Sequence, residues 1–308
     1  MTLNERAWAV ADELERDAER LRVAVSHVAG ARVIDCGGAV TGSLRAGLLL
    51  ARACVSDLAD VSLVPGDGGP LVQVWTDDPL RACMASQYAG MKVQVGRFFA
   101  MGSGPMRALV GREELLTELK LTETAACAVG VLESRKHVTE DVVAHIVGKL
   151  PTDAERLSLL VAPSFSLAGC LQVVARSVET ALHKLRELKF DLRSVVSGFG
   201  TAPLPPVAAD EMAAIGRTND AILYGGRVTL WVRADDEVID AIGPKVPSSA
   251  SKDHGSLFAE LFAQYGDFYK IDPLLFSPAE VTLVNLKTGR ARTFGKCEPG
   301  LLAKSFLG

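Results

Sequence analysis

The 308-residue chain is long enough for one large domain or two ordinary ones, each with a substantial core. A formal net charge of −4 leaves no basic field for nucleic acid, so we expect a small molecule or a protein as partner. The apolar runs are too short to cross a bilayer, and the first residues lack a secretory pattern, which predicts a cytoplasmic protein without membrane contact. The six cysteines form no C-x-x-C pair, so we expect free thiols.

The first half of the chain alternates helical and strand patterns. Thr2 and Glu5 form a capping-box pattern, and apolar residues at helical spacing predict one helix from there to about Val28. Later patterns predict, in order, a strand at 32–36, a helix at 44–58, a hairpin of strands 61–64 and 71–75 with a long loop, a short helix at 79–87, a strand at 93–99, a buried strand at 126–132 and a helix at 140–147.

A domain boundary is expected at Pro151 to Glu155, which divides the chain into α+β domains at 1–150 and 151–308 whose segments can interleave. Further strands are predicted at 194–197, 227–232, 281–286 and 292–294, with short helices at 210–215 and 257–264. Three prolines and two glycines within 198–206 predict a stiff loop and argue against a central strand there.

One long helix is predicted from Ser164 to Leu185, and the rest of the chain is expected to surround it. Its apolar residues recur at steps of three and four, and its first half contains a single long polar side chain. At about 100° per residue, the long polar side chains fall in one narrow stripe. They are Gln172, Arg176, Glu179 and His183.

Two interpretations of Arg176 and Glu179 remain open from spacing alone. An arginine and a glutamate three residues apart can be an ordinary ion pair that contributes a few tenths of a kcal/mol and no chemistry. They can instead be a carboxylate that takes a proton from water and a guanidinium that keeps it ionised and in place. Spacing does not decide between them.

Several catalytic classes lack their motifs. The five histidines include no H-E-x-x-H, which argues against a zinc hydrolase, and no G-x-S-x-G supports a serine hydrolase. The glycines at 102 and 104 fit a tight turn better than a phosphate-binding loop, because no complete phosphate-loop motif is present. Acid–base chemistry by carboxylate, arginine and polar loops remains.

The sequence resembles the methenyltetrahydromethanopterin cyclohydrolase family over essentially its whole length. Six ordered blocks carry the resemblance: Met84 to Gly90 (MASQYAG), Met101 to Ala108 (MGSGPMRA), Val161 to Gly169 (VAPSFSLAG) with its continuation to Glu179, Gly200 to Pro206 (GTAPLPP), Ile215 to Gly226 (IGRTNDAILYGG) and Pro247 to Asp253 (PSSASKD). Met91 departs from the family pattern, in which an aromatic residue follows the glycine.

The resemblance implies an α+β fold of two intertwined α/β-type domains with a large pocket between them, often assembled as a homotrimer. It also implies a metal-free enzyme with no permanently bound cofactor, which reversibly hydrolyses a methenyl-pterin to its 5-formyl derivative in one-carbon metabolism, either formaldehyde oxidation in methylotrophs or a methanogenic-type route. The carrier substrate is tetrahydromethanopterin or its dephospho form. Glu179 is then the base, and Arg176 orients the carboxylate and the water.

Polar and aromatic residues in the blocks and loops are candidate contacts for the pterin, although each of them can also cap a helix or hold a turn. They are Ser86, Gln87, Tyr88, Ser103, Glu133, Thr201, Arg217, Asn219, Asp220, Lys252 and Phe276. Two other functions remain possible: an enzyme acting on a different pterin or a folate, and a catalytically silent pterin-binding protein.

Overall fold

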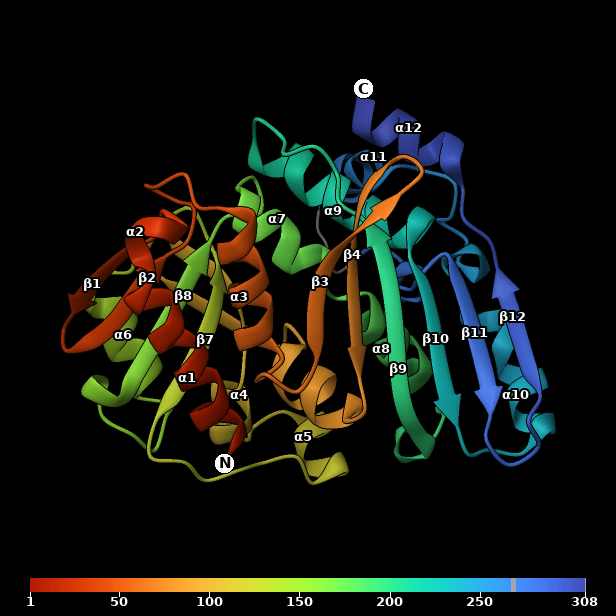
Figure 1. Ribbon diagram of the computed structural model, residues 1–308, viewed down its shortest axis with the longest axis horizontal. Helices are drawn as coiled ribbons and strands as arrows, with labels where there is room; N and C mark the ends of the chain where they lie inside the picture. The colour runs from red at the N-terminus through yellow and green to blue at the C-terminus, as the bar shows by residue number, and fades with distance from the viewer. Residues whose placement is uncertain (267–269, 308) are drawn as a thin grey trace. The chain divides into compact units, whose positions relative to one another are not determined.

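The computed structural model describes residues 1–266 and 270–307. The chain divides into two compact units (Figure 1). The first unit comprises residues 1–59 and 81–172, and the second comprises residues 60–80 and 173–308. Each unit contains one six-stranded sheet with helices, which confirms the predicted α+β class with two domains. The chain therefore contributes one internal segment to the second unit before it completes the first.

The sheet of the first unit has the order β1-β2-β8-β7-β6-β5, and its three neighbours β2, β8 and β7 run parallel. Parallel strands are buried on both faces, and the alternation of their side chains shows this. Ile34 and Leu160 pack in a core with α1 and α3, whereas Leu159 and Val161 pack in a core with α6. The strands are β1 (Ala24–Val28), β2 (Ala31–Asp35), β5 (Met91–Val95), β6 (Phe98–Ser103), β7 (Ala128–Glu133) and β8 (Leu157–Ala162).

Helices connect and cover these strands. They are α1 (Leu3–Arg16), α2 (Ala18–Leu21), α3 (Leu44–Cys54), the π-helix η1 (Leu80–Gln87), α4 (Met106–Val110), α5 (Glu114–Leu119), α6 (Glu140–Val147) and α7 (Leu167–Val174), with a short 3-10 turn η2 (Ala154–Arg156).

The sheet of the second unit has the order β12-β11-β10-β9-β4-β3, in which only β10 and β11 run parallel. Its strands are β3 (Asp60–Gly66), β4 (Gly69–Thr76), β9 (Val195–Pro203), β10 (Arg227–Val232), β11 (Glu280–Asn285) and β12 (Ala291–Gly295). Its helices are α8 (Ser177–Glu187), α9 (Glu211–Gly225), α10 (Asp236–Ile242), α11 (Phe258–Tyr265) and α12 (Pro299–Leu307), with 3-10 turns η3 (Leu192–Ser194), η4 (Gly243–Lys245), η5 (Ser248–Ala250) and η7 (Pro273–Leu275). Helix α8 packs on β9, β10 and β4.

The predicted helix from residue 3 to 28 is wrong beyond its first part. The capping box of Thr2 and Glu5 is present, but α2 ends at Arg22 in the left-handed conformation with φ 57°. The following residues form strand β1, which pairs antiparallel with β2. Pairing with β2 thus overrides the helical spacing of the apolar residues, which continues past the true end of the helix.

The predicted strand at 93–99 is instead a hairpin. Strand β5 ends at Val95 and β6 begins at Phe98, with Gly96 at φ 52° in the turn. The hairpin predicted at 61–75 is confirmed, but its loop is short, because the pairing of β3 with β4 extends to Gly66 opposite Gly69. Positive φ at a glycine is the conformation that tight hairpin turns require.

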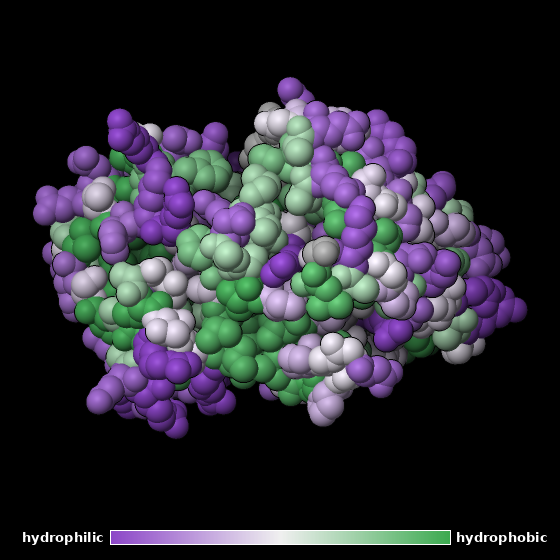
Figure 2. Space-filling view, turned by 90° about the horizontal axis from the view of Figure 1, so that it is seen from above, coloured by the Kyte–Doolittle hydropathy of each residue, from purple (hydrophilic) through white to green (hydrophobic). Residues whose placement is uncertain are grey.

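All six cysteines are free. Within residues 1–266 and 270–307, no helix is both long and apolar enough to cross a membrane. Figure 2 shows hydrophobic residues reaching the surface among hydrophilic ones. One of the exposed hydrophobic residues is Trp75 on β4, which is 41% exposed.

Candidate active site

The predicted long helix is two helices that break at Arg176. Helix α7 ends at Val174, and α8 begins at Ser177, with Arg176 as its N-cap residue at φ −90° and ψ 9°. No glycine or proline marks this break in the sequence. Arg176 and Glu179 therefore lie at the start of a helix, where the unpaired N–H groups and the helix dipole favour a negative charge.

Two glycines of β9 let α8 approach the sheet closely. A Cβ atom on Gly198 would lie 2.7 Å from Val178 Cγ1, and one on Gly200 would lie 2.4 Å from Ser177 Oγ. Real Cβ atoms are not found at such distances, so neither position accepts a side chain without movement of the helix. The strand thus holds the two residues between Arg176 and Glu179 in place.

This packing also corrects the predicted loop at 198–206. Strand β9 continues to Pro203 and pairs antiparallel with β10 on one side and β4 on the other, so it is a central strand. The glycines that argued against a strand are required by helix contact, and the prolines lie at its end or beyond it. Composition alone does not distinguish a glycine that belongs to a loop from one that lets a helix pack closely on a strand.

Burial agrees with the predicted enclosure of the carboxylate. Glu179 is 7% exposed, and Arg176 is half-buried. Ser177, between them, is fully buried, and its Oγ has no hydrogen-bond partner among the residues that the structure describes. Gln172, the other buried member of the polar stripe, lies on α7 and donates from Nε2 to Cys54 Sγ at 3.5 Å. The break therefore divides the stripe between two helices.

In the first unit, polar groups gather where the parallel strands end. Glu133 ends β7, and its Oε1 accepts a hydrogen bond from Ser164 Oγ, after β8, at 2.7 Å. Asp35 ends β2, and its carboxylate accepts hydrogen bonds from three backbone amides, those of residues 37 to 39, at 2.6 to 3.0 Å. Ligands of α/β sheets bind outside the carboxyl ends of strands, and contact of Glu133 with a substrate at this edge stays a prediction.

Ser86 and Ser103 belong to one buried cluster in the first unit. Ser86 Oγ donates to the carbonyl of Cys54 at 2.6 Å, and Ser103 Oγ lies 3.3 Å from Cys54 Sγ. The amide of Gly104 donates to the carbonyl of Ser86 at 2.8 Å, a contact between distant parts of the chain. These contacts are structural, and Ser86 and Ser103 are 0% and 2% exposed. Their contact with a substrate stays a prediction.

Sequence reasoning did not single out Arg107, which organises the end of η1. This fully buried arginine pairs with Glu113 and donates to the carbonyls of Met84, Ala85 and Ser86. Its guanidinium also lies 5.0 Å from the ring centroid of Tyr88, and the neighbouring Gln87 is fully buried. Arg107 lies within one of the resemblance blocks, but no spacing pattern signals a buried arginine.

Three predicted contact residues on α9 have structural partners in the second unit. Arg217 donates to the carbonyls of Pro206 and Ser305, and Asn219 donates to that of Ile215. Asp220 accepts hydrogen bonds from the amide of Phe258 at 2.9 Å and from Ser305 Oγ at 2.7 Å, and burial raises its pKa to about 6. These bonds connect α9 to α11 and α12. A role in substrate binding stays a prediction for all three.

The remaining predicted contacts in the second unit are Thr201, Lys252 and Phe276, which lie on different segments of the chain. Side chains alternate along a strand, so Thr201 points to the face of the sheet opposite Gly200 and hence away from α8. Lys252 is exposed. Phe276 is half-buried and packs edge-to-face on Phe258, with 6.0 Å between ring centroids. Within this unit, the structure does not bring Thr201 to the face that α8 covers.

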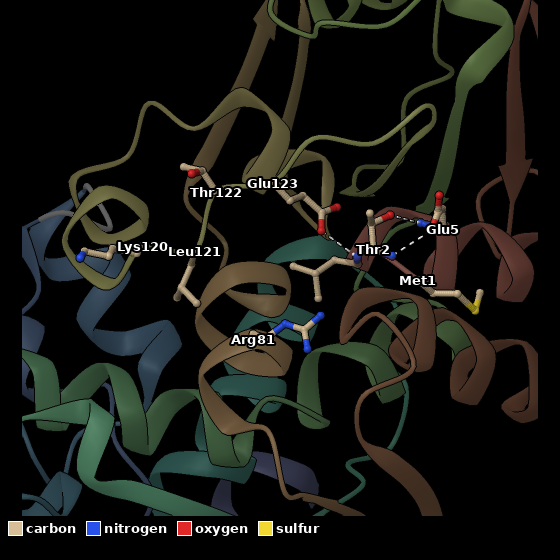
Figure 3. A pocket seen from close by; sticks show the side chains of 9 residues that line it. Met1, Thr2, Glu5, Arg81, Lys120, Leu121, Thr122 and Glu123 are labelled. Carbon is tan, nitrogen blue, oxygen red and sulfur yellow. Dashed lines mark hydrogen bonds between the residues drawn. The ribbon is translucent and has the colours of Figure 1, made fainter.

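The cavities in the described part of the first unit include a larger and a smaller one. One of about 450 Å³ lies at the start of α1 (Figure 3), where Glu123 accepts hydrogen bonds from the amides of Leu3 and Asn4. It is lined by Met1, Thr2, Leu3, Glu5, Arg81, Lys120, Leu121, Thr122 and Glu123 and includes none of the predicted site residues. A smaller one of about 80 Å³ lies beside Asp35 and the segment 134–138. In the described part of the chain, no three His, Cys, Asp or Glu side chains are grouped to hold a metal ion.

Comparison with known proteins gives a consistent result. The family model described as Cyclohydrolase (MCH) matches residues 2–306. A methenyltetrahydromethanopterin cyclohydrolase of Rhodopirellula baltica is 52% identical over 91% of this chain and 87% of its own length. Proteins of the same name from Methylobacillus flagellatus and Methanosarcina barkeri are 42% and 39% identical, each over 99% of this chain and over 95% and 98% of their own lengths. The chain therefore belongs to the cyclohydrolase (MCH) family.

Proposed function

We propose that this protein catalyses the reversible hydrolysis of 5,10-methenyltetrahydromethanopterin to 5-formyltetrahydromethanopterin. The observation that carries the proposal is identity of 39% to 52% across nearly the whole chain to proteins named for this activity. The substrate is the pterin or its dephospho form, within one-carbon metabolism. We further propose a homotrimer in solution, which light scattering would test by the mass of three chains.

In the proposed reaction, the water nucleophile must be activated, whereas the substrate is already electrophilic. The methenyl carbon lies between two nitrogens and already bears positive charge, so activation of water is the demanding step. The water oxygen bonds to this carbon while Glu179 takes one water proton. In the adduct, the hydroxyl proton leaves as the carbonyl forms, the bond from carbon to the second nitrogen breaks, and that nitrogen gains a proton. The formyl group stays on the first nitrogen, and one proton is released overall.

The position of Glu179 supports its assignment as the base. It is the third residue of α8 and 7% exposed, so its carboxylate is partly withdrawn from water yet lies in the first turn of a helix. Burial favours the neutral acid, whereas the helix N-terminus and the neighbouring guanidinium favour the carboxylate. Arg176 would orient the carboxylate and the water, since its planar fork can hold two partners.

Loss of the methenyl absorbance measures the reaction directly. Wild-type protein is expected to turn over methenyl-tetrahydromethanopterin equally with and without a chelator, and more efficiently than methenyl-tetrahydrofolate. Binding without any loss of absorbance would identify a silent pterin-binding protein instead. A chelator-sensitive rate would contradict the metal-free mechanism, and faster turnover of the folate would reassign the substrate.

The variant Glu179→Gln tests the base. We expect substrate binding to persist and turnover to fall about 10²–10⁴-fold, which is the usual contribution of a positioned base. Glu187→Gln is the matched control, because the same chemical change is made on the same helix, at its last residue. Nearly normal hydration by the Glu179→Gln variant would remove Glu179 from the mechanism.

A further inference from the structure

Helix α8 carries a lysine that is completely buried. Lys184 is 0% exposed, and its Nζ donates a hydrogen bond to the carbonyl of Leu274. Burial lowers the pKa of Lys184 to about 8, although the charge of Asp272 opposes this shift. Buried lysines are rare because the ammonium loses its hydration, so a buried lysine needs compensating contacts.

The segment that receives this hydrogen bond is itself tied to a second loop. Asp272 Oδ2 accepts from Ser251 Oγ at 2.6 Å, and the backbone amide of Asp272 donates to Asp253 Oδ2 at 3.0 Å. Tyr265 donates from its hydroxyl to Asp253 Oδ1, also at 3.0 Å. The loops 251–253 and 272–276 are therefore one hydrogen-bonded assembly, and Lys184 attaches it to α8.

Two of the candidate substrate contacts lie on this assembly. Lys252 stands between Ser251 and Asp253, both of which are held by side-chain hydrogen bonds, while Lys252 itself is exposed. Phe276 follows Leu275, which is fully buried, and is itself only half-buried. Each loop thus carries one candidate contact residue: Lys252 is exposed, whereas Phe276 is half-buried and packs on Phe258.

We propose that Lys184 is a positioning residue that fixes the loops bearing Lys252 and Phe276 relative to the first turn of α8. This inference rests on the proposed function. Lys184 follows Glu179 by five residues, about 7.5 Å along the axis of a rigid helix. A single helix thereby carries the water-activating pair at its start and the anchor of the two loops in its second half. Substrate held by the loops is presented at a fixed distance from the base.

The variant Lys184→Met tests this role. Methionine fills a similar volume but has neither the donor nor the charge, so the loops should lose their attachment while α8 stays packed. We expect the KM for the methenyl substrate to rise about 10-fold and kcat per folded molecule to fall less than about 3-fold, as for an interaction that acts through substrate binding. If Lys184 served stability alone, activity would fall with the folded fraction and KM would not change.

Two further variants keep the test decisive. Asp272→Asn weakens the same assembly from its other end and should also raise KM, even if the Lys184 variant does not fold. Asn285→Leu is the matched control: Asn285 is 1% exposed and donates to the carbonyl of Ala234 at 2.9 Å, but it lies on β11. This control should lower the melting temperature without changing KM.

The outcomes separate this inference from the proposed function. No turnover by the wild-type protein would overturn the proposed function itself. Normal wild-type turnover, with an unchanged KM in folded Lys184→Met and Asp272→Asn, would overturn the positioning role alone. An equal rise in KM in the Asn285→Leu control would also overturn it. Partial recovery of KM in Lys184→Gln, which restores a shorter donor, would support it.

Discussion

Helices α7 and α8 follow one another in the chain, and their sequence suggests a single helix, yet they differ in almost every physical respect. Helix α7 is apolar on nearly all sides, and its one long polar side chain, Gln172, is buried. Helix α8 places Arg176 and Glu179 at its start and buries the charged Lys184 in its second half. The first helix therefore fills a core, whereas the second holds charged side chains in defined positions.

Both helices depend on glycines, but with different consequences. A Cβ on Gly47 of α3 would lie 3.0 Å from Ala168 Cα and from Leu171 Cβ of α7. A Cβ on Gly200 would lie closer, 2.4 Å from Ser177 Oγ of α8. The first contact positions only core side chains. The second contact positions the helix turn that bears Arg176 and Glu179. A displacement of this turn should therefore lower the turnover rate.

After Glu179→Gln, the largest effect on turnover is expected from Arg176→Lys, which tests whether charge on α8 is functional. A lysine keeps the charge but cannot hold two partners in one plane, so we expect turnover to fall about 10²-fold. Arg186→Lys makes the same change near the end of α8 and should leave turnover unchanged. Equal rates for the Arg176 variant and the wild type in the methenyl assay would make Arg176 a purely structural residue.

Gly200→Ala and Gly47→Ala compare the two close contacts directly. Overpacking of this kind costs about 1–3 kcal/mol in unfolding free energy, and alanine within α3 regains up to about 1 kcal/mol of helix propensity. We expect turnover per folded molecule to fall about 10-fold only for Gly200→Ala, since small displacements of catalytic groups are costly. Urea unfolding and the methenyl assay measure the two quantities. An equal loss of turnover in Gly47→Ala would show that the two close contacts do not differ in their effect on catalysis.

A second substitution should partly rescue Gly200→Ala. Ser177→Ala removes the Oγ atom that the new methyl group meets first and leaves Ser177 Cβ at 3.2 Å from it. Because that hydroxyl is buried without a partner among the described residues, its removal alone should cost less than about 1 kcal/mol. Failure of the double variant to recover any stability would place the strain elsewhere.

The buried charge of α8 predicts a dependence of stability on pH. The pKa of Lys184 is lowered to about 8 in the folded protein from an ordinary value of 10.5, so between these values the unfolded chain binds more protons. The contribution of this group therefore rises with pH across that window, by about 1 kcal/mol per pH unit. Unfolding of Lys184→Met, followed from pH 8 to 10, should lack this rise. An identical slope in the variant would assign it to other groups.

The smallest effect is expected at the start of α7. Ser166 precedes the first residue of α7, and its Oγ accepts a hydrogen bond from the amide of Gly169 at 3.0 Å, so it caps the helix. Ser166→Ala should lower the unfolding free energy by about 1 kcal/mol, as is usual for loss of a cap, without changing KM. A change in KM would show that α7 also contributes to substrate binding, which the comparison of the two helices does not anticipate.

Much of the fold was predictable because local patterns agreed with tertiary contacts. The buried strand at 128–133, the helix from residue 140 and the capping box at Thr2 all follow their sequence signals. The failures share one cause: a distant segment decided the local structure. The helical segment predicted to reach residue 28 ends with α2 at Leu21, before the paired strand β1, and contact with a helix required the glycines that made β9 resemble a loop. The residue pattern within one segment does not show which distant strand or helix packs against it.

The candidate site was predictable to a lesser extent. Enclosure of Glu179 followed from its apolar surroundings, and the family followed from the six blocks. The helix break at Arg176 could not be predicted, since no glycine or proline marks it. The two helices differ in their packing partners: α7 contacts α3, whereas α8 contacts β9. The fully buried Arg107 and Lys184 could not be inferred either, since charged residues are normally exposed and their carbonyl partners are distant in sequence.

The early contribution of β3 and β4 to the second sheet constrains how the protein can be made and divided. During synthesis, β4 emerges more than a hundred residues before β9, with which its residues Leu71–Thr76 pair. Until then its edge offers unpaired backbone groups to any neighbouring chain, and such long-range closure is slow. Fragments cut at residue 172 would keep that edge open permanently. Neither half should be obtainable as a well-behaved separate polypeptide, and nascent chains should depend on protection against aggregation until β9 arrives.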